Sequence, residues 1–439
     1  MVADEGGRVL RTGDHGYDRT PAGRLGVLRL RAARLAWSAL ALLSAIVLLP
    51  APALAQGAWS TAQAENLLHW IERAPGEGLE LPADTAPRLR SAIDAGDTQQ
   101  LQPVAHDAAL LLMQGWRGRC CSKPAPSWWH IDGHVSDDDL RQGLDAALES
   151  DRLDLYLRSI RPSHPLYESL VDALAAEEDP SRRAVLKTNL ARWRWLPASM
   201  GPRYLLVNIA SQKLTLWEAG KPAARWRVIV GKPATRTPVF RAEVSGVVLN
   251  PWWEIPSSIA AEGIARLVQR NPAAARARGY VYQNGRYRQM PGDNNALGRM
   301  KLVMPNPYSV FLHDTSNRDL FAEDDRFFSH GCVRVDRALS FAATLLEADG
   351  WDEEAVNAQV ATGETRTVTL SRTIPLYVTY FTAEAEPSGE VRYFDDAYGR
   401  DPAPASASLG SDRLVYLGAG QKAELDAPSE LGEGRGCAM

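Results

Sequence analysis

One stretch constrains this chain more than any other, because it places two histidines and one cysteine around a short turn. The stretch begins at His313 and, after a long loop, ends with Ser-His-Gly-Cys at Cys332. The apolar run Tyr308–Leu312 predicts a buried strand that delivers His313 to the end of a sheet. Helical spacing over Asp336–Gly350 predicts a helix that is capped by its first residue. Cys332 is therefore expected on a turn just ahead of a helix N-terminus.

This placement favours a cysteine nucleophile. A thiol has a pKa of about 8.5, and a helix N-terminus or a nearby imidazolium can lower that pKa by several units. The base that activates the thiol would be His313 or His330. Gly331 permits a tight turn, so the amides of Gly331 and Cys332 are expected to point at a developing oxyanion. The alternative is a buried structural cysteine, but the polar residues clustered around Cys332 favour catalysis.

The pattern His-(long loop)-Ser-His-Gly-Cys-x-Arg resembles the signature of the L,D-transpeptidase catalytic domain, the YkuD-type fold. Other segments resemble a larger periplasmic branch of that family, and the resemblance covers about Ala64 to Asp401. These segments are Val207–Ile209, Val228–Lys232, Thr237–Phe240, Asn250–Trp253, Gln289–Gly292, Asn295–Arg299 and Pro305–Asn306.

The resemblance implies acyl transfer through a thioester. Cys332 would attack the carbonyl that follows the L-centre of meso-diaminopimelate in a tetrapeptide stem, and D-Ala would leave. An amine would then resolve the acyl-enzyme. The implied base is His313, while His330 and Gly331 shape the site. The alternative for His330 is a role in packing or hydrogen bonding alone.

The resemblance also implies substrate contacts. Arg334 would meet a substrate carboxylate, which its planar guanidinium can bind through two hydrogen bonds. The alternative for Arg334 is a salt bridge to a nearby acid such as Asp325 or Asp336. The other residues expected at the substrate are Ser329, Tyr308, Trp252 and Trp253.

The irregular segment Pro251–Gly298 is, by the same resemblance, a lid over the active-site cleft. Long insertions in a compact domain are usually functional or mobile. A helical stretch is expected over Ser257–Gln269, and the turn Gly292–Asn295 is a candidate hinge. The alternative for Trp252 and Trp253 is that they anchor a core.

The expected function is peptidoglycan biosynthesis, in which stem peptides form 3-3 cross-links. A D-amino acid or a lipoprotein is an alternative amine acceptor. An L,D-carboxypeptidase or amidase-type hydrolase of the same fold is the alternative enzyme, because it would share nucleophile and base and differ only in how well water is excluded. A non-catalytic wall-binding scaffold is the alternative from another class, although such a module does not need the thiol.

The N-terminal region predicts export to the periplasm. After a polar extension, several arginines precede the apolar run Leu35–Leu49, and Ala53–Ala55 supplies a cleavage site of the A-x-A type. Together they predict a secretory signal peptide that is cleaved after Ala55. The alternative is a membrane anchor, the one case in which a membrane would be a partner. The run is shorter than the ~20 residues that a spanning helix needs.

Export would place the four cysteines in an oxidising compartment, where Cys332 is expected to remain a free thiol. The pair Cys120–Cys121 is adjacent, and Cys437 lies near the end. A zinc site would combine the pair with His130 and His134, but zinc-binding cysteines are usually two to four residues apart. A redox-labile or solvated loop is therefore preferred, and no metal or cofactor is expected. The net charge of −4 gives no indication of nucleic-acid binding.

Periodicity predicts an α+β protein. Apolar stripes at helical spacing predict a helical scaffold domain over residues 56–200, with Ser136 as an N-cap. Short alternating strands predict a predominantly β catalytic domain over 201–401, with a barrel-like or sandwich sheet. The tail 402–439 is rich in Ala, Ser, Gly and Pro, which is typical of disorder.

Related proteins usually carry a peptidoglycan-binding helical module ahead of the segment that here reads Leu186–Pro197. The short separation of Tyr167 from that segment predicts that the module is absent from this chain.

Overall fold

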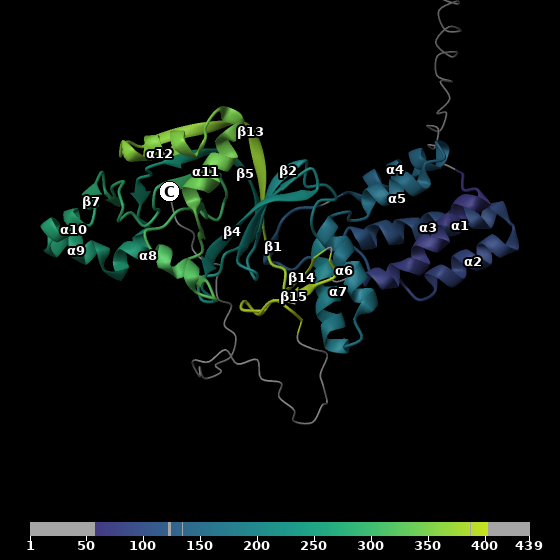
Figure 1. The fold of residues 1–439 in the computed structure, drawn as a ribbon. Coiled ribbons are helices and arrows are strands. Elements are labelled where there is room, and N and C mark those ends of the chain that lie inside the picture. Colours follow the sequence, from purple (N-terminus) through teal and green to yellow (C-terminus); the bar gives the residue numbers. More distant parts are fainter. Residues whose placement is uncertain (1–57, 122–123, 134, 387, 403–439) are drawn as a thin grey trace, which may run out of the picture. The chain divides into compact units, whose positions relative to one another are not determined.

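The computed structural model describes residues 58–121, 124–133, 135–386 and 388–402. The predicted signal peptide, the predicted disordered tail, His134 and Cys437 lie outside these residues. A helical part precedes a β-rich part (Figure 1), as expected for the α+β class. No helix within the described ranges has both the length and the apolar character needed to cross a membrane.

The first part of the described chain is helical and has a hydrophobic core of its own. Leu67, Leu112 and Leu144 are fully buried in this core. Ser136 caps a helix, as predicted: its hydroxyl accepts the backbone N–H of Asp139, whose carboxylate accepts the N–H of Ser136. The elements of this part are α1 (Thr61–Arg73), a 3-10 turn (Ala74–Glu77), α2 (Thr85–Ala95), α3 (Thr98–Trp116), α4 (Asp137–Glu149) and α5 (Leu153–Ile160).

Two further helices, α6 (Pro165–Ala176) and α7 (Pro180–Arg194), share the core of the β-rich part. Leu170 of α6 and Leu190 of α7 are fully buried there. Only Glu177–Asp179 separate the two helices.

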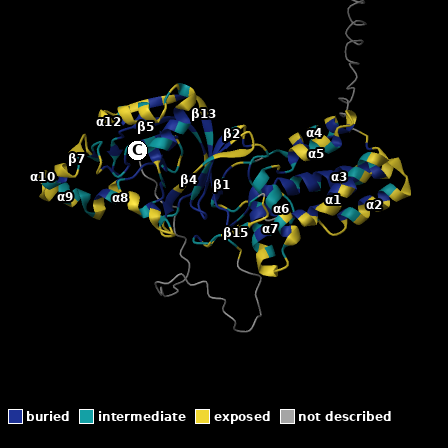
Figure 2. Ribbon diagram, viewed as in Figure 1, coloured by how far each residue is buried: buried dark blue, intermediate teal, exposed yellow. Residues whose placement is uncertain are grey.

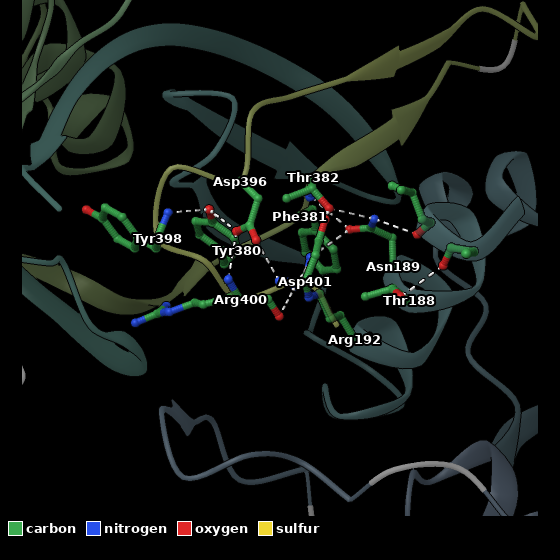
Figure 3. Close-up of polar contacts among 12 residues, drawn as sticks. Thr188, Asn189, Arg192, Tyr380, Phe381, Thr382, Asp396, Tyr398, Arg400 and Asp401 are labelled. Atoms are coloured by element: carbon green, nitrogen blue, oxygen red, sulfur yellow. Dashed lines mark hydrogen bonds and ion pairs between the residues drawn. The ribbon is translucent and has the colours of Figure 1, made fainter. Parts of the chain in front are cut away.

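Polar contacts fasten α7 to the chain around Thr382 and to the end of the described C-terminal segment (Figure 3). The side-chain amide of Asn189 donates to Oγ1 of Thr382 at 3.0 Å, and the backbone N–H of Thr382 donates to Oδ1 of Asn189 at 2.9 Å. The fully buried guanidinium of Arg192 forms an ion pair with Asp401 at 2.7 Å. A buried charge is tolerated only when it is paired, so Asp401 holds the segment against α7.

The β-rich part is built on one ten-stranded sheet. Its strands follow the order β1-β5-β13-β2-β3-β4-β12-β10-β9, β11 pairs with β4, and an additional pairing of β5 with β9 closes the path. This closure agrees with the barrel-like sheet that the sequence predicts. The strands are β1 (Trp129–His130), β2 (Arg203–Asn208), β3 (Lys213–Glu218), β4 (Lys221–Gly231), β5 (Val239–Leu249), β9 (Met300–Val303), β10 (Leu312–His313), β11 (Phe327–Ser329), β12 (Val333–Val335) and β13 (Arg366–Thr379). The remaining elements of this part are the hairpin strands β14 (Ala383–Ala385) and β15 (Val391–Tyr393) and 3-10 turns at Arg318–Ala322 and Glu347–Asp349.

Two helices follow the cysteine motif, α11 (Ala338–Leu346) and α12 (Glu353–Ala361), and lie beside β13 and β5 (Figure 1). The predicted helix is therefore present, but strand β12 separates it from Cys332. Asp336 does not cap the helix, because its carboxylate pairs with Arg227 at 2.8 Å. Because β12 lies between Cys332 and α11, the expectation that Cys332 lies just ahead of a helix N-terminus is wrong.

The strand that leads to His313 is shorter than predicted. Only β10 forms, because the chain turns at Ser309, where φ is 51°. The side-chain oxygen of Asn306 accepts the backbone N–H groups two and four residues later. This local turn replaces the strand pairing that was expected over Tyr308–Leu312.

The predicted lid, residues 251–298, has its own three-stranded sheet, ordered β6-β8-β7, and its own small core. Its helices are mostly exposed or half-buried (Figure 2). The predicted helical stretch is present but contains a π-helical turn. The elements are β6 (Trp253–Glu254), α8 (Ser257–Ile259), the π-helical turn (Ala260–Ile264), α9 (Ala265–Arg270), α10 (Pro272–Ala277), β7 (Tyr280–Gln283) and β8 (Arg286–Gln289).

The turn Gly292–Asn295, predicted as a hinge, is held firmly. Asn295 is buried, and its side-chain amide donates to the carbonyls of Pro251 at 3.0 Å and Met290 at 2.9 Å. The lid backbone departs from helical geometry instead at Gly263, where φ is 145° and no atom would meet an added Cβ within 4 Å. Gly292 has a similar φ of 147° and equally open surroundings. Glycine adopts this conformation without a steric penalty, so Gly263 is a second candidate for a hinge beside Gly292.

Candidate active site

Strand register brings three chemically active side chains into one row. His313 on β10 lies opposite Arg334 on the parallel strand β12 and opposite Lys301 on the antiparallel strand β9. Directly opposed residues in a sheet project from the same face. We call Lys301, His313 and Arg334 the cross-strand row.

Cys332 immediately precedes β12 and lies two residues before Arg334, the member of the row on that strand. Its side chain is buried, with 2% exposed, and its Sγ accepts the backbone N–H of Phe311 at 3.4 Å. Such a contact stabilises negative charge on sulfur. The structure holds Cys332 in a disulfide, which differs from the free thiol expected from the sequence. A second disulfide joins Cys120 to Cys121.

Hydrogen bonds hold the turn before Cys332 in place. The hydroxyl of Ser329 donates to the carbonyl of Cys332 at 2.5 Å and accepts the N–H of Gly331 at 3.0 Å. The carbonyl of Gly331 accepts the hydroxyl of Thr237 at 2.8 Å. Gly331 has a φ of 117°, a conformation that favours glycine. Because Ser329 occupies the N–H of Gly331, that amide does not face an oxyanion, contrary to the expectation from the sequence.

His313 is held as a neutral imidazole. Its pKa is lowered to about 3, first by complete burial and further by the charges of Arg334 and Lys301. The backbone carbonyls of Asp314 and Leu297 face the ring and act in the opposite direction. A neutral imidazole can donate to only one of these two carbonyls. A protonated ring could donate to both carbonyls, which favours the imidazolium and partly opposes the lowering of the pKa.

Arg334 is half-buried, and burial lowers its pKa. Neither acid proposed as its salt-bridge partner pairs with it, and Asp336 is bound to Arg227. Across the described ranges Arg334 forms no ion pair and no side-chain hydrogen bond. An unpaired, half-buried guanidinium beside the cysteine is suited to binding an anion.

His330 lies on the exposed side of the same turn. Its side chain is 38% exposed, and its Nε2 lies 3.5 Å from the carboxylate of Glu262 in the lid. A partly exposed imidazole two residues before Cys332 is accessible to a substrate, whereas His313 is enclosed. The two histidines therefore occupy different environments.

Comparison with known proteins now bears on this arrangement. Residues 202–361, which contain the row and the cysteine turn, match the family model described as the L,D-transpeptidase catalytic domain, YkuD. Residues 202–361 are therefore similar to the L,D-transpeptidase catalytic domain. Residues 52–174 match a second family model, described as a Scaffold domain.

The chain is also similar to individual proteins. A Haemophilus influenzae protein called "Putative L,D-transpeptidase" is 30% identical over an alignment of 281 residues, which covers 58% of this chain and 57% of the relative. The chain thus spans less than two thirds of that relative's length. A solved L,D-transpeptidase from Mycobacterium smegmatis is 12% identical, with 40% of this chain and 58% of that chain covered and a TM-score of 0.23. One from Mycobacterium tuberculosis is 13% identical, with 40% and 57% covered and a TM-score of 0.22. TM-scores this low carry no argument about the fold.

The aromatic residues expected at the substrate of the transpeptidase domain fall into different environments. Tyr308 is half-buried, and its ring stacks on that of His130 at 5.0 Å. Trp252 is half-buried beneath the guanidinium of Arg288, at 4.4 Å from the ring centroid. Trp253 is 9% exposed in the core of the lid, which matches the alternative of a core anchor rather than a substrate contact. The substrate roles of Tyr308 and Trp252 stay predictions.

Sequence reasoning missed Lys301 and Glu262, and it considered His130 only as a zinc ligand. Lys301 joins the site only through strand register, and the alternation of Met300–Val303 was the signal that could have revealed its strand. Glu262 reaches His330 through the fold of the lid, for which the sequence carries no local signal. His130 enters through β1, which adds to β5 in parallel.

The alternative zinc site is not supported by its cysteines. Cys120 and Cys121 form a disulfide, so they are not available as thiolate ligands. His130 stacks on Tyr308. Among the described residues there is no group of three or more His, Cys, Asp or Glu side chains placed to hold a metal ion.

Proposed function

We propose that the protein is an exported L,D-transpeptidase that acts on tetrapeptide stems of peptidoglycan through a thioester on Cys332. The observation that carries the proposal is the cross-strand row beside Cys332: a neutral, buried His313 next to a guanidinium, on Arg334, that has no acidic partner in the described chain. A base and an anion-binding group at one nucleophile are the parts that acyl transfer from a carboxylate-bearing peptide requires.

In the first half-reaction the thiol of reduced Cys332 gives its proton to His313, and the sulfur attacks the carbonyl at the L-centre of meso-diaminopimelate. The amide C–N bond breaks, D-Ala leaves with the proton from His313, and a thioester remains. Arg334 binds a carboxylate of the donor and so fixes the carbonyl near sulfur. In the second half-reaction an amine attacks the thioester, the C–S bond breaks and the sulfur takes up a proton.

The turn of Ser329 and Gly331 positions the sulfur in this scheme. The hydroxyl of Ser329 both donates and accepts a hydrogen bond within the turn. Ser329 therefore positions Cys332 and does not contact the substrate. The lid excludes water from the acyl-enzyme, which favours an amine acceptor over hydrolysis. The acceptor is a second stem peptide, a D-amino acid or a lipoprotein.

To test the proposal, purified protein is treated with a reductant and incubated with tetrapeptide muropeptides. The products are then identified by mass analysis. Cross-linked dimers support transfer. Tripeptides alone would assign the hydrolase alternative, and absence of both products together with absence of a β-lactam adduct on Cys332 would remove the enzymatic proposal. The Cys332→Ala variant is the matched control.

We also propose export to the periplasm with cleavage after Ala55, on the basis of the arginine-rich region, the apolar run and the Ala53–Ala55 site. N-terminal sequencing of the native protein should give Gln56 as the first residue. Retention of Arg24 would contradict cleavage and support the membrane anchor.

A further inference from the structure

His313 lies between two cations, of which only Arg334 belongs to the motif. Lys301 is half-buried on β9, and its Nζ lies 4.6 Å from the centroid of the Phe311 ring. Burial lowers the pKa of Lys301. Within the described ranges Lys301, like Arg334, forms no ion pair and no side-chain hydrogen bond.

The acids near the row are engaged elsewhere. Glu254 of the lid, whose charge acts on Lys301, pairs with Arg288 at 2.6 Å. Asp314 pairs with Arg318 at 2.7 Å and also accepts the backbone N–H of Arg299. The row therefore holds two uncompensated positive charges beside the nucleophile. Half-burying a charge without a partner costs stability, which points to a ligand that supplies the missing anions.

We propose that Lys301 is a second carboxylate-binding residue of the donor site, and that Lys301 and Arg334 together select stem peptides with two free carboxylates around the scissile bond. This inference rests on the proposed function. A tetrapeptide stem meets the requirement: the leaving D-Ala carries its terminal carboxylate, and diaminopimelate carries another at its D-centre. A donor with one of these groups amidated would leave one cation unpaired.

The spacing of the row supports two separate carboxylates rather than one shared group. Neighbouring strands lie about 4.8 Å apart, so the backbones of Lys301 and Arg334, with His313 between them, are separated by about 10 Å. One carboxylate on each side of the scissile carbonyl would place that carbonyl near His313 and Cys332. The Lys301 ammonium also lies over the aromatic face of Phe311, a cation–π contact that favours its charged form.

Occupation of both cations has a consequence for the base. The charges of Arg334 and Lys301 help to lower the pKa of His313, although burial is the larger cause. A doubly anionic donor offsets both charges, so the pKa of His313 rises when this donor binds. The substrate thereby strengthens the base that attacks it.

The test is a cycle of variants and donors. D-Ala release by reduced enzyme is measured for the wild type and Lys301→Met with three tetrapeptides: the diacid, one amidated at the D-centre and one amidated at D-Ala. Lys301→Met should lower kcat/KM for the diacid by roughly tenfold to a hundredfold, the usual range for a charged hydrogen bond. With the donor that lacks the carboxylate held by Lys301, the same variant should lose less than about threefold, which identifies that carboxylate.

Lys301→Arg should restore most of the activity, because it restores the charge, and Lys221→Met on the exposed start of β4 is the matched control. Equal losses with all three donors, or no loss with the diacid, would overturn the inference. The far-UV circular dichroism of Lys301→Met should match that of the wild type, which excludes a damaged fold. If the wild type releases D-Ala from none of the donors, the proposed function itself has failed, and this result is separate from the loss specific to Lys301→Met.

Discussion

The carboxylate of Glu262 lies 3.5 Å from the imidazole of His330, and this contact joins the lid to the turn that carries Cys332. Gly263, with its φ of 145°, follows Glu262 directly. Movement of the segment 251–298 away from the turn would break this contact.

Glu262→Gln should loosen the lid and shift the products from dimers toward tripeptides. Both side chains are partly exposed, so the pair contributes at most about 1 kcal/mol, and the ratio should change by no more than about fivefold. Mass analysis of the products measures this ratio, and hydrogen exchange over Ser257–Arg270 should quicken in parallel. Glu354→Gln, on the exposed face of α12, is the control. If neither the ratio nor the exchange changes, other contacts hold the lid.

Cys332 should react with a thiol-directed β-lactam or iodoacetamide only after reduction, because the structure holds it in a disulfide. Intact-protein mass spectrometry with and without reductant measures this. Equal labelling in both conditions would show that Cys332 is a thiol in solution.

The remaining cysteine of the sequence, Cys437, is the residue to replace next, because Cys120 and Cys121 are bonded to each other. If the disulfide is intramolecular, Cys437→Ser should be labelled without reductant. Continued dependence on reductant would assign the partner thiol to another molecule. The double variant of Cys120 and Cys121 to Ser should still need reductant, and after reduction its turnover should stay within a few fold of the wild type.

Features that depend on neighbours in sequence were predicted well. Ser136 caps α4 as expected, because a cap needs only the residue three positions later. The alternation of Leu205 and Val207 identified β2 for a similar reason. Cys332, His313 and Arg334 were found through their motif, and register then placed His313 opposite Arg334.

Features that depend on distant residues were not predicted. Lys301 becomes part of the site only because β9 pairs with β10, and a sequence does not state which strands pair. Asp336 has the residue type of a cap, but Arg227 on β4 competes for its carboxylate. Asn295 was likewise not predicted correctly. Its side chain was placed in a candidate hinge, but it donates hydrogen bonds to the carbonyls of Pro251 and Met290.

Two histidines with lowered pKa values, the half-buried His164 and the buried His313, should make the protein sensitive to acid. Burial lowers the pKa of His164 to about 3, and His313 has a pKa of about 3 as well, against an ordinary value of 6.5. Below pH 6.5 the unfolded chain binds protons that the folded chain does not bind. The free energy of unfolding should therefore fall as the pH decreases from 6.5 toward 3, by at most about 1.4 kcal/mol per pH unit for each histidine.

His164→Gln separates this effect from general acid denaturation. His164 contacts the hydroxyl of Tyr204 at 2.8 Å and stacks on Trp193 at 4.3 Å, so the variant should be less stable at pH 7. Its pH dependence between 6 and 4 should nevertheless be flatter, by roughly 1 kcal/mol per pH unit in urea titrations. The exposed His69→Gln should keep the slope of the wild type. An unchanged slope in His164→Gln would show that His164 is protonated in the folded state.

The catalytic roles of the two site histidines give the decisive prediction. Cys332→Ala should abolish D-Ala release and covalent labelling of the reduced protein. His313→Ala should slow acylation by about a hundredfold to ten-thousandfold, the usual range for a positioned base, and should move the pH dependence of labelling toward the value of about 8.5 for an unassisted thiol. Because nucleophile and base act as one unit, the double variant should lose no more than Cys332→Ala alone.

His330→Ala is the control that assigns the base. His330 is partly exposed and contacts the lid, whereas His313 is buried in the cross-strand row beneath two backbone carbonyls that would stabilise its protonated form. The variant should therefore retain most of the acylation rate and change mainly the transfer to an amine. If His330→Ala loses as much acylation as predicted for His313→Ala while His313→Ala stays active, the base is His330. If both variants acylate at the rate of the wild type, neither histidine accepts the proton of Cys332, and the mechanism derived from the row is wrong.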